Sequence, residues 1–207
     1  MYKMLSVEDK IRVPPSKFGL GAENAVKSSL EERLEGTVDK NLGVVLSIIS
    51  IDNIGEGKIL PGDGAIHYPV KFKVIVYQPE MYEVAKGHVI DITEFGVFVR
   101  IGPVDGMVHV SQLMDDFVSY DGKNSTFVGR DSKRILKEGD TVRTRIVSVS
   151  MGPDKQYKIG LTTRQFGLGA LSWLDRDRER KDKKETAPPA KAPPAKKKGR
   201  KQGHSRL

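Results

Sequence analysis

The chain has 207 residues, of which 38% are hydrophobic, and a formal net charge of +8. It contains no cysteine, which excludes disulfides and thiolate zinc sites, and its four histidines are scattered along the sequence. The longest apolar run, around Val44 to Ile51, is too short to cross a bilayer, and the first residues lack the apolar core of a signal peptide. We therefore expect a soluble, cytoplasmic protein without a bound metal or cofactor.

All of the excess positive charge lies at the end of the chain. Residues 175–207 contain 13 Lys and Arg against 5 Asp and Glu, so the preceding residues are electrically balanced. Pro-Pro pairs alternating with lysine cannot bury enough apolar surface to offset the entropy lost on ordering. We predict that 175–207 is a disordered Lys/Pro/Ala-rich basic tail, which either binds nucleic acid weakly and nonspecifically or only keeps the protein in solution.

Residues 1–81 have the pattern of an α+β domain. Apolar residues recur at helical spacing between Ala22 and Glu35, and Gly36 follows where a glycine commonly ends a helix. Pro14 and Pro15 end the extended segment that precedes this helix. The predicted elements are, in chain order, a strand over 2–13, a helix over 22–35, a buried strand over 43–54 and an alternating strand over 65–77.

A glycine- and proline-rich loop, GEGKILPGDG at 55–64, separates the last two of these strands. Its Gly57-Lys58 pair is superficially like a phosphate-binding loop, but Ile59 follows where that loop needs a hydroxyl group to ligate magnesium. A long exposed loop between strands is instead typical of a contact arm. The sequence also lacks a GxSxG elbow, an HExxH helix and a carboxylate or histidine cluster, so we predict no catalytic site.

Residues 82–164 have the pattern of a small all-β barrel. Five short strands, with a long connection between the third and the fourth, match the five-stranded Greek-key OB fold. The connection, 114–138, is polar, and we expect a short helix or an ordered insertion there. Residues 165–174 predict a short segment that packs onto the barrel through Trp173 and its neighbouring leucines. The five strands are predicted over 83–92, 96–101, 106–110, 141–149 and 157–162.

Alternation along 95–113 predicts a distinct set of side chains on one face of this barrel. The aliphatic residues between Val97 and Ile101 share the inward face at period two, so the residues between them point outward. Aromatic and basic side chains on one sheet face form a platform on which nucleic-acid bases stack. Spacing alone fits equally well with half-buried barrel aromatics and an ordinary surface histidine. The candidate contacts are Phe95, Phe98, Arg100, His109 and Lys158.

The second region resembles the S-one RNA-binding domain, an OB-fold family. In that family two aromatics and a histidine at matching motif positions contact single-stranded RNA, which implies Phe95, Phe98 and His109 here. A basic position of the family falls on Lys158, and Ser150 stands where the family has an acid. The matching motifs are GHV at 87–89, FGVFV at 95–99, DGMVHVS at 105–111, KEGD at 137–140 and KIGLT at 158–162.

The first region resembles the E-prime stalk proteins of archaeal RNA polymerase, the counterparts of subunit seven of eukaryotic RNA polymerase II. The matching motifs are VPPSKFG at 13–19, LEG at 34–36, GVVL at 43–46, IGEGKI at 54–59 and GDGA at 62–65. The resemblance implies a ribonucleoprotein-like α+β tip domain over 1–81 and an S-one barrel over 82–164. It also implies a loop that docks on the polymerase core near its clamp, through Gly55, Glu56, Gly57, Lys58, Ile59, Gly62, Asp63 and Gly64.

The same resemblance implies the function. It predicts a noncatalytic stalk subunit of a nucleotidyltransferase complex, DNA-directed RNA polymerase, that binds nascent single-stranded RNA and supports open-complex formation, processivity and termination. A small helical stalk partner, the F protein of that polymerase, would pack along both domains. The alternative is a free-standing S-one adaptor in translation or RNA decay, which would not need the motifs of the first region.

Overall fold

A long antiparallel sheet is the frame of the N-terminal half. The computed structural model describes residues 1–154 and 156–185, with side chains of the last helix described to Glu179. The strands lie in the order β1-β5-β3-β2, and β4 pairs with the free end of β5. The elements are β1 (Tyr2–Val13), η1 (Pro15–Leu20), α1 (Ala22–Leu34), β2 (Val38–Asp39), β3 (Gly43–Ile54), β4 (Lys58–Ile59) and β5 (Ile66–Tyr77), which confirms the predicted helix and strands.

The helix α1 covers one face of this sheet because β1 and β5 alternate. Odd-numbered residues of β1 turn inward, so Ile11 and Val13 are fully buried while their neighbours are exposed. They pack with Phe72 of β5 and with Val26 and Leu30 of α1 in one core. Each fully buried aliphatic side chain stabilises the domain by about 1.5–3 kcal/mol. Val45 and Ile48 of β3 complete this core, so three strands and the helix α1 share it.

The C-terminal half contains the predicted barrel. Its strands follow the order β13-β8-β7-β6-β12, and pairing between β12 and β13 closes the sheet. The five predicted strands are confirmed, although the third begins slightly earlier and β12 ends later than expected. They are β6 (Val84–Thr93), β7 (Gly96–Ile101), β8 (Val104–His109), β12 (Thr141–Met151) and β13 (Tyr157–Thr162), and β14 (Gly169–Ala170) adds to β12.

Two glycines allow the strands of this barrel to approach one another. A Cβ atom on Gly96 would lie 2.4 Å from the Val108 carbonyl oxygen, and one on Gly87 would lie 2.5 Å from Val99 Cγ1. Both distances are far below van der Waals contact, so any larger residue would push the strands apart. Glycine at these two positions therefore lets the neighbouring barrel strands pair closely.

The connection between the third and fourth barrel strands is an ordered insertion, one of the two outcomes expected. It begins with a single turn, η2 (Val110–Gln112), and then forms a three-stranded sheet that the sequence did not predict. Phe127 and Leu136 of this sheet are buried and complete the barrel core. The small strands are β9 (Val118–Asp121), β10 (Thr126–Gly129) and β11 (Ile135–Lys137).

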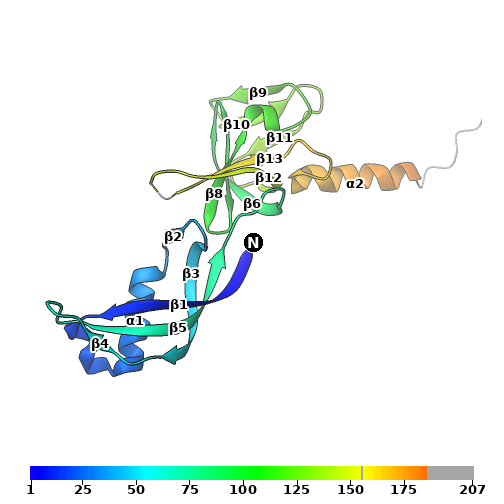
Figure 1. Cartoon of the computed structure of the whole chain (residues 1–207). Coiled ribbons are helices and arrows are strands. Elements are labelled where there is room, and N and C mark those ends of the chain that lie inside the picture. The colour runs from blue at the N-terminus through cyan, green and yellow to red at the C-terminus, as the bar shows by residue number, and fades with distance from the viewer. Residues whose placement is uncertain (155, 186–207) are drawn as a thin grey trace, which may run out of the picture.

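The prediction of disorder from Asp175 onward is wrong for residues 175–185. They continue the helix α2 (Leu171–Glu185), which extends away from the barrel (Figure 1). Trp173 is buried and its indole N–H donates to the Ile135 carbonyl at 3.0 Å. The Arg134 guanidinium lies 5.6 Å from the centre of that ring and bonds to Asp177 at 2.5 Å. These contacts anchor a helix whose own composition is almost entirely polar. The rest of the predicted tail, 186–207, lies outside the described residues.

The linker between the halves is joined to the barrel by backbone hydrogen bonds. The Tyr82 N–H donates to the Ile146 carbonyl at 2.8 Å, and the Ile146 N–H donates to the Glu83 carbonyl at 2.9 Å. On the other side of the junction the Tyr2 and Tyr77 rings meet edge to face at 5.0 Å. Figure 1 shows the tip sheet and the barrel at opposite ends of an elongated molecule.

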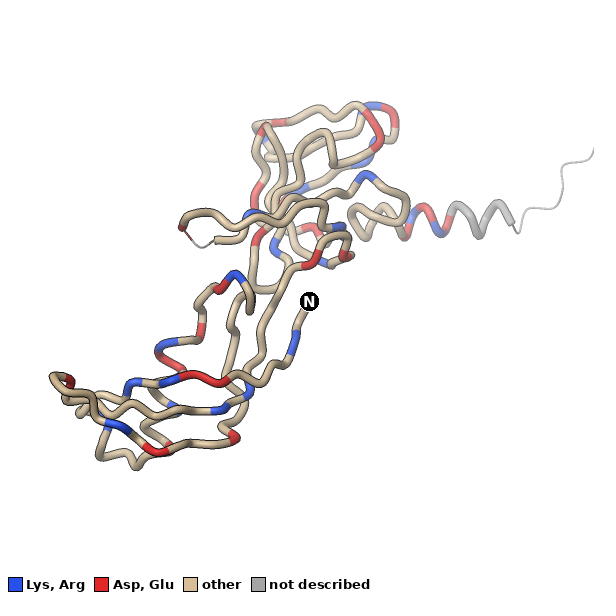
Figure 2. The backbone as a smooth tube through the Cα atoms, viewed as in Figure 1, with Lys and Arg blue, Asp and Glu red and all other residues tan. Residues whose placement is uncertain are grey.

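Charges of both signs are interspersed over the two domains, as Figure 2 shows. This distribution agrees with the balanced count for the body of the chain. Within the described residues, no helix is long and apolar enough to cross a membrane.

Candidate nucleic-acid interface

The strand register brings three of the predicted contact residues to one outer face of the barrel. In the β7–β8 pair Gly96 lies opposite His109, and Arg100 lies opposite Asp105. Directly opposed residues point to the same side of a sheet, and so do residues two apart. Phe98, Arg100 and His109 therefore lie together on the outside, while the residues between them fill the core.

Lys158 joins this face from the neighbouring strand. The strand β13 runs parallel to β8, with Gly160 beside Met107, so Lys158 lies on the same side of the sheet two residues away. It is exposed and lies opposite Ser150, whose hydroxyl group donates to the Lys158 backbone carbonyl at 3.3 Å. The register places Lys158 level with Asp105, on the face that also carries Phe98 and His109.

Phe95 and Phe98 form an aromatic pair at the edge of the face. Their ring centroids are 6.2 Å apart and the rings are perpendicular, a favourable edge-to-face arrangement. Phe95 is 49% exposed and Phe98 is partly buried. Both rings therefore keep accessible aromatic surface on which a base can stack.

His109 is held in one orientation by the turn that follows it. Its Nδ1 accepts from the Ser111 backbone N–H at 3.3 Å and lies 2.9 Å from the Ser111 hydroxyl oxygen. A backbone N–H is only a donor, so Nδ1 is the acceptor and the neutral ring carries its proton on Nε2. His109 consequently presents an N–H donor suited to a phosphate or base oxygen.

Arg100 is already paired within the protein. Its guanidinium makes two hydrogen bonds to Asp105, and this carboxylate raises the pKa of Arg100 above its ordinary value. A phosphate that binds Arg100 must therefore compete with Asp105. Arg100 thus lies on the predicted face, but its guanidinium group is already bonded to Asp105.

Met107 belongs to the same face, although sequence reasoning did not single it out. It lies directly opposite Phe98 and beside Gly160, and it is partly exposed. A methionine within an alternating strand gives no functional signal of its own. Only the pairing register reveals that it lies between the aromatic ring and the glycine.

The predicted docking loop lies at the other end of the molecule, beyond the tip sheet (Figure 1). It is not entirely a loop, since β4 within it pairs with β5 through Lys58–His67 and Ile59–Ile66. Ile59 is 70% exposed. A Cβ atom on Gly57 would lie 2.6 Å from the Ile66 side chain, so this glycine lets the segment fold back against β5. The structure thus separates the two groups of predicted site residues.

Two family models match the chain. Residues 8–64 match the family described as "SHS2 domain found in N terminus of Rpb7p/Rpc25p/MJ0397". Residues 78–160 match the family described as "S1 RNA binding domain". Among solved structures, the chain is similar to RNase R of Mycoplasma genitalium over 39% of this chain and 13% of that one, with 23% identity and a TM-score of 0.35.

Curated relatives extend the likeness through both halves. The chain is 38% identical to DNA-directed RNA polymerase subunit Rpo7 of Saccharolobus shibatae, over 84% of this chain and 97% of that protein. It is 36% identical to Rpo7 of Sulfolobus acidocaldarius over 86% and 97% of the two chains. It is 26% identical to DNA-directed RNA polymerase II subunit RPB7 of Glycine max over 83% and 97%. Because the match to the archaeal proteins includes nearly their whole length, the chain belongs to the Rpo7/RPB7 family of DNA-directed RNA polymerase subunits.

Proposed function

We propose that this chain is a stalk subunit of RNA polymerase whose barrel binds nascent single-stranded RNA and so supports open-complex formation, processivity and termination. The observation that carries the proposal is the outer face of β7, β8 and β13, which carries Phe98, His109 and Lys158 on the same side of the sheet. In this proposal the chain has no catalytic site of its own, and RNA synthesis is the work of other subunits. It acts in the cytoplasm, where such a polymerase transcribes.

The chemistry of this face suits a transcript of any sequence. Each base stacked on an aromatic ring contributes about 1–3 kcal/mol, and every base offers such a surface. The Lys158 ammonium and the His109 Nε2–H supply donors to phosphate or base oxygens. The body of the chain has no net charge, so long-range attraction is weak and binding is modest. Modest, sequence-tolerant contact allows RNA to advance as it is synthesised.

The tip domain attaches the chain to the polymerase core in this proposal. The loop 55–64 docks on the polymerase core near the clamp of that core. The tip domain extends to Met81, since the Tyr82 N–H already bonds to β12 of the barrel. A short segment over 165–174 then packs onto the barrel, with Trp173 buried against it. In this proposal the tip domain therefore binds the polymerase core, and the barrel binds the RNA that the polymerase makes.

A small helical stalk partner is proposed to cover the junction of the two domains. Large apolar side chains remain exposed around this junction, which favours a protein partner there. They are Tyr2, Met4, Met81, Tyr82 and Val84, with exposed fractions of 45% to 71%.

Copurification tests the proposed function. The full-length tagged chain, recovered from a cell extract, is expected to bring down the polymerase core together with a small helical protein. Enrichment of ribosomes or of a nuclease in place of the polymerase would contradict the proposal and favour a free-standing RNA-binding adaptor.

A further inference from the structure

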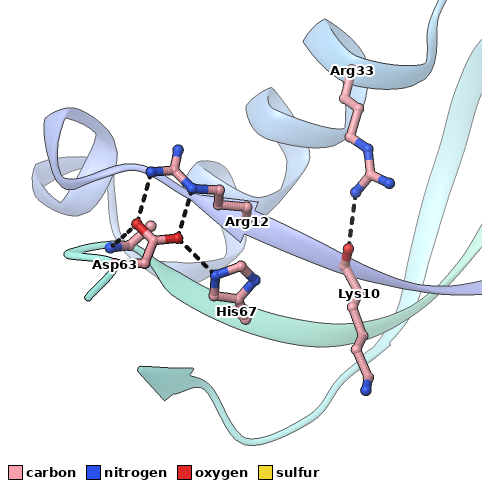
Figure 3. A network of polar contacts seen from close by, with 6 residues as sticks. Lys10, Arg12, Arg33, Asp63 and His67 are labelled. Carbon is pink, nitrogen blue, oxygen red and sulfur yellow. Dashed lines mark hydrogen bonds and ion pairs between the residues drawn. The ribbon is translucent and has the colours of Figure 1, made fainter. Parts of the chain in front are cut away.

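The loop 55–64 is fixed by a polar network that joins three separate segments, as Figure 3 shows. Arg12 at the end of β1 donates from Nε to Asp63 Oδ2 at 2.9 Å and from Nη2 to Asp63 Oδ1 at 2.8 Å. His67 of β5 bonds to Asp63 Oδ2 through Nε2 at 3.0 Å, and the Ala65 N–H donates to Oδ1 at 3.1 Å. Hydrogen bonds from Arg12 and His67 hold the pKa of Asp63 far below its usual range, so the carboxylate stays charged.

A tight turn lies directly before this network. The Asp63 N–H donates to the Leu60 carbonyl at 3.1 Å, and Gly62 has a φ of 86°. Pro61 precedes Gly62, so Leu60-Pro61-Gly62-Asp63 has the proline and glycine positions of a type II turn. Pro61 and the positive-φ Gly62 therefore favour the turn by themselves, independently of the bonds from Arg12 and His67 to Asp63. The turn and the network together leave the loop little freedom.

This ordered loop presents apolar side chains to solvent. Ile59 is 70% exposed and Leu60 is 50% exposed, immediately before the turn. The turn η1, whose Phe18 and Leu20 are 45% and 54% exposed, begins near it, because a Cβ atom on Gly64 would lie 3.9 Å from Pro15. Exposed apolar residues on a rigid element are typical of a docking surface, since ordering entropy is not lost on binding.

We propose that Arg12, Asp63 and His67 form a clamp that holds Ile59 and Leu60 in position as the anchors of this chain on an apolar recess of the polymerase core. This inference rests on the proposed function, which makes the loop the docking element. The three clamp residues are positioning residues, whereas Ile59 and Leu60 make the contact. Without the clamp the loop samples other shapes, and only the fraction with the bound shape can dock.

The kinetics of docking separate positioning from contact. A smaller binding-competent fraction slows association, whereas a lost contact mainly speeds dissociation. The experiment measures binding of the full-length chain to polymerase core that lacks it. Asp63→Asn, which keeps the shape but removes the charge, is expected to lower the association rate constant about tenfold with little change in dissociation. Arg12→Lys keeps the charge but loses the pair of hydrogen bonds to Asp63. Its association rate constant should lie between those of Asp63→Asn and the unmodified chain.

Two further variants complete the design. Replacing both anchors, Ile59→Ser with Leu60→Ser, should speed dissociation at least tenfold. Glu8→Gln is the matched control, because Glu8 forms an ion pair with Lys71 that links the same two strands, four residues along each strand from Arg12 and His67; its docking rates should not change. Amide hydrogen exchange over 58–66 should accelerate in Asp63→Asn but not in Glu8→Gln.

Each result has one meaning. If the anchor variant docks normally, the loop is not the docking element and the proposed attachment fails together with the clamp. If the anchor variant loses binding while Asp63→Asn and Arg12→Lys dock at normal rates, attachment stands and the clamp is overturned. Faster dissociation of Asp63→Asn with unchanged association would make Asp63 a direct contact, which also overturns the clamp.

Discussion

Arg100 reaches across the β7–β8 pair and donates two hydrogen bonds to Asp105, from Nε to Oδ1 at 2.8 Å and from Nη2 to Oδ2 at 3.1 Å. Both side chains are well exposed, so solvent screens the pair and its contribution to folding stability is small. Its importance lies in the proposed RNA-binding face of β7, β8 and β13, because Asp105 occupies the guanidinium group that a phosphate would otherwise bind.

Asp105→Asn is therefore expected to tighten RNA binding several-fold and to make it more dependent on salt. The substitution removes a negative charge from the face and frees Arg100 for a phosphate. Fluorescence anisotropy with single-stranded RNA at about 50 mM and about 200 mM salt measures both effects. Asp9→Asn, which removes the carboxylate partner of Arg33 in the tip domain, is the matched control. Equal binding by the two variants would mean that Arg100 does not contact RNA.

Phe98→Ala should raise the dissociation constant for single-stranded RNA about 5- to 150-fold. This range corresponds to the loss of about 1–3 kcal/mol of stacking on one ring. Phe18→Ala, an exposed phenylalanine of the tip domain, controls for loss of aromatic surface elsewhere. If both variants bind equally well, the affinity belongs to the seven cations from Lys191 to Arg206, and deleting 186–207 should then abolish it.

Trp173→Ala should lower the free energy of unfolding of the barrel by about 3–5 kcal/mol, because it removes a buried aromatic side chain. Trp173→Phe keeps most of that volume and loses the hydrogen bond to Ile135, so about 1–2 kcal/mol is expected. Urea titrations followed by far-UV circular dichroism measure both values. Equal losses for the two variants would show that the hydrogen bond, not the packing, holds α2.

Alkaline pH should destabilise the junction of the domains through Tyr77. Burial raises the pKa of Tyr77 to about 12, whereas an unfolded tyrosine ionises near about 10. The unfolded chain releases its proton first, so the stabilisation is complete below about pH 10 and is lost as the pH rises toward about 12. Urea midpoints across this window should fall less steeply for Tyr77→Phe. Tyr82→Phe, at an exposed ring, is the matched control, and identical slopes for Tyr77→Phe and the unmodified chain would contradict the assignment.

Period-two alternation explains why the barrel and its outer face could be predicted from the sequence. Val97, Val99 and Ile101 are all buried, and this places Phe98 and Arg100 outside whatever the neighbouring strands do. The pairing of Arg100 with Asp105 is not predicted, because the strand is expected to begin at residue 106, which leaves Asp105 in the turn. The turn has only two residues, Gly102 and Pro103, and this length sets the register that pairs Arg100 with Asp105.

The three strands of the insertion and the helix α2 were not predicted, for a different reason. The strands β9, β10 and β11 have three or four residues each, too few for a period to be recognised. After Leu174 the helix has charges of both signs and no apolar stripe, so its order depends on Trp173 and Arg134 at its base. Both the small sheet and the helix α2 are therefore formed because of tertiary contacts, which local composition does not reveal.

The hydrogen bonds between the linker and Ile146 have a mechanical consequence. Ile146 lies in β12, the strand that pairs with β13 and hence with the backbone that carries Lys158. A pull on RNA held at the barrel would therefore be transmitted along paired backbone to Tyr82, and on the tip side of the linker the Gln78 N–H donates to the Met1 carbonyl at 2.9 Å. We expect the molecule to behave as a stiff lever, so that distances between spin labels placed on the two domains stay narrowly distributed with and without RNA.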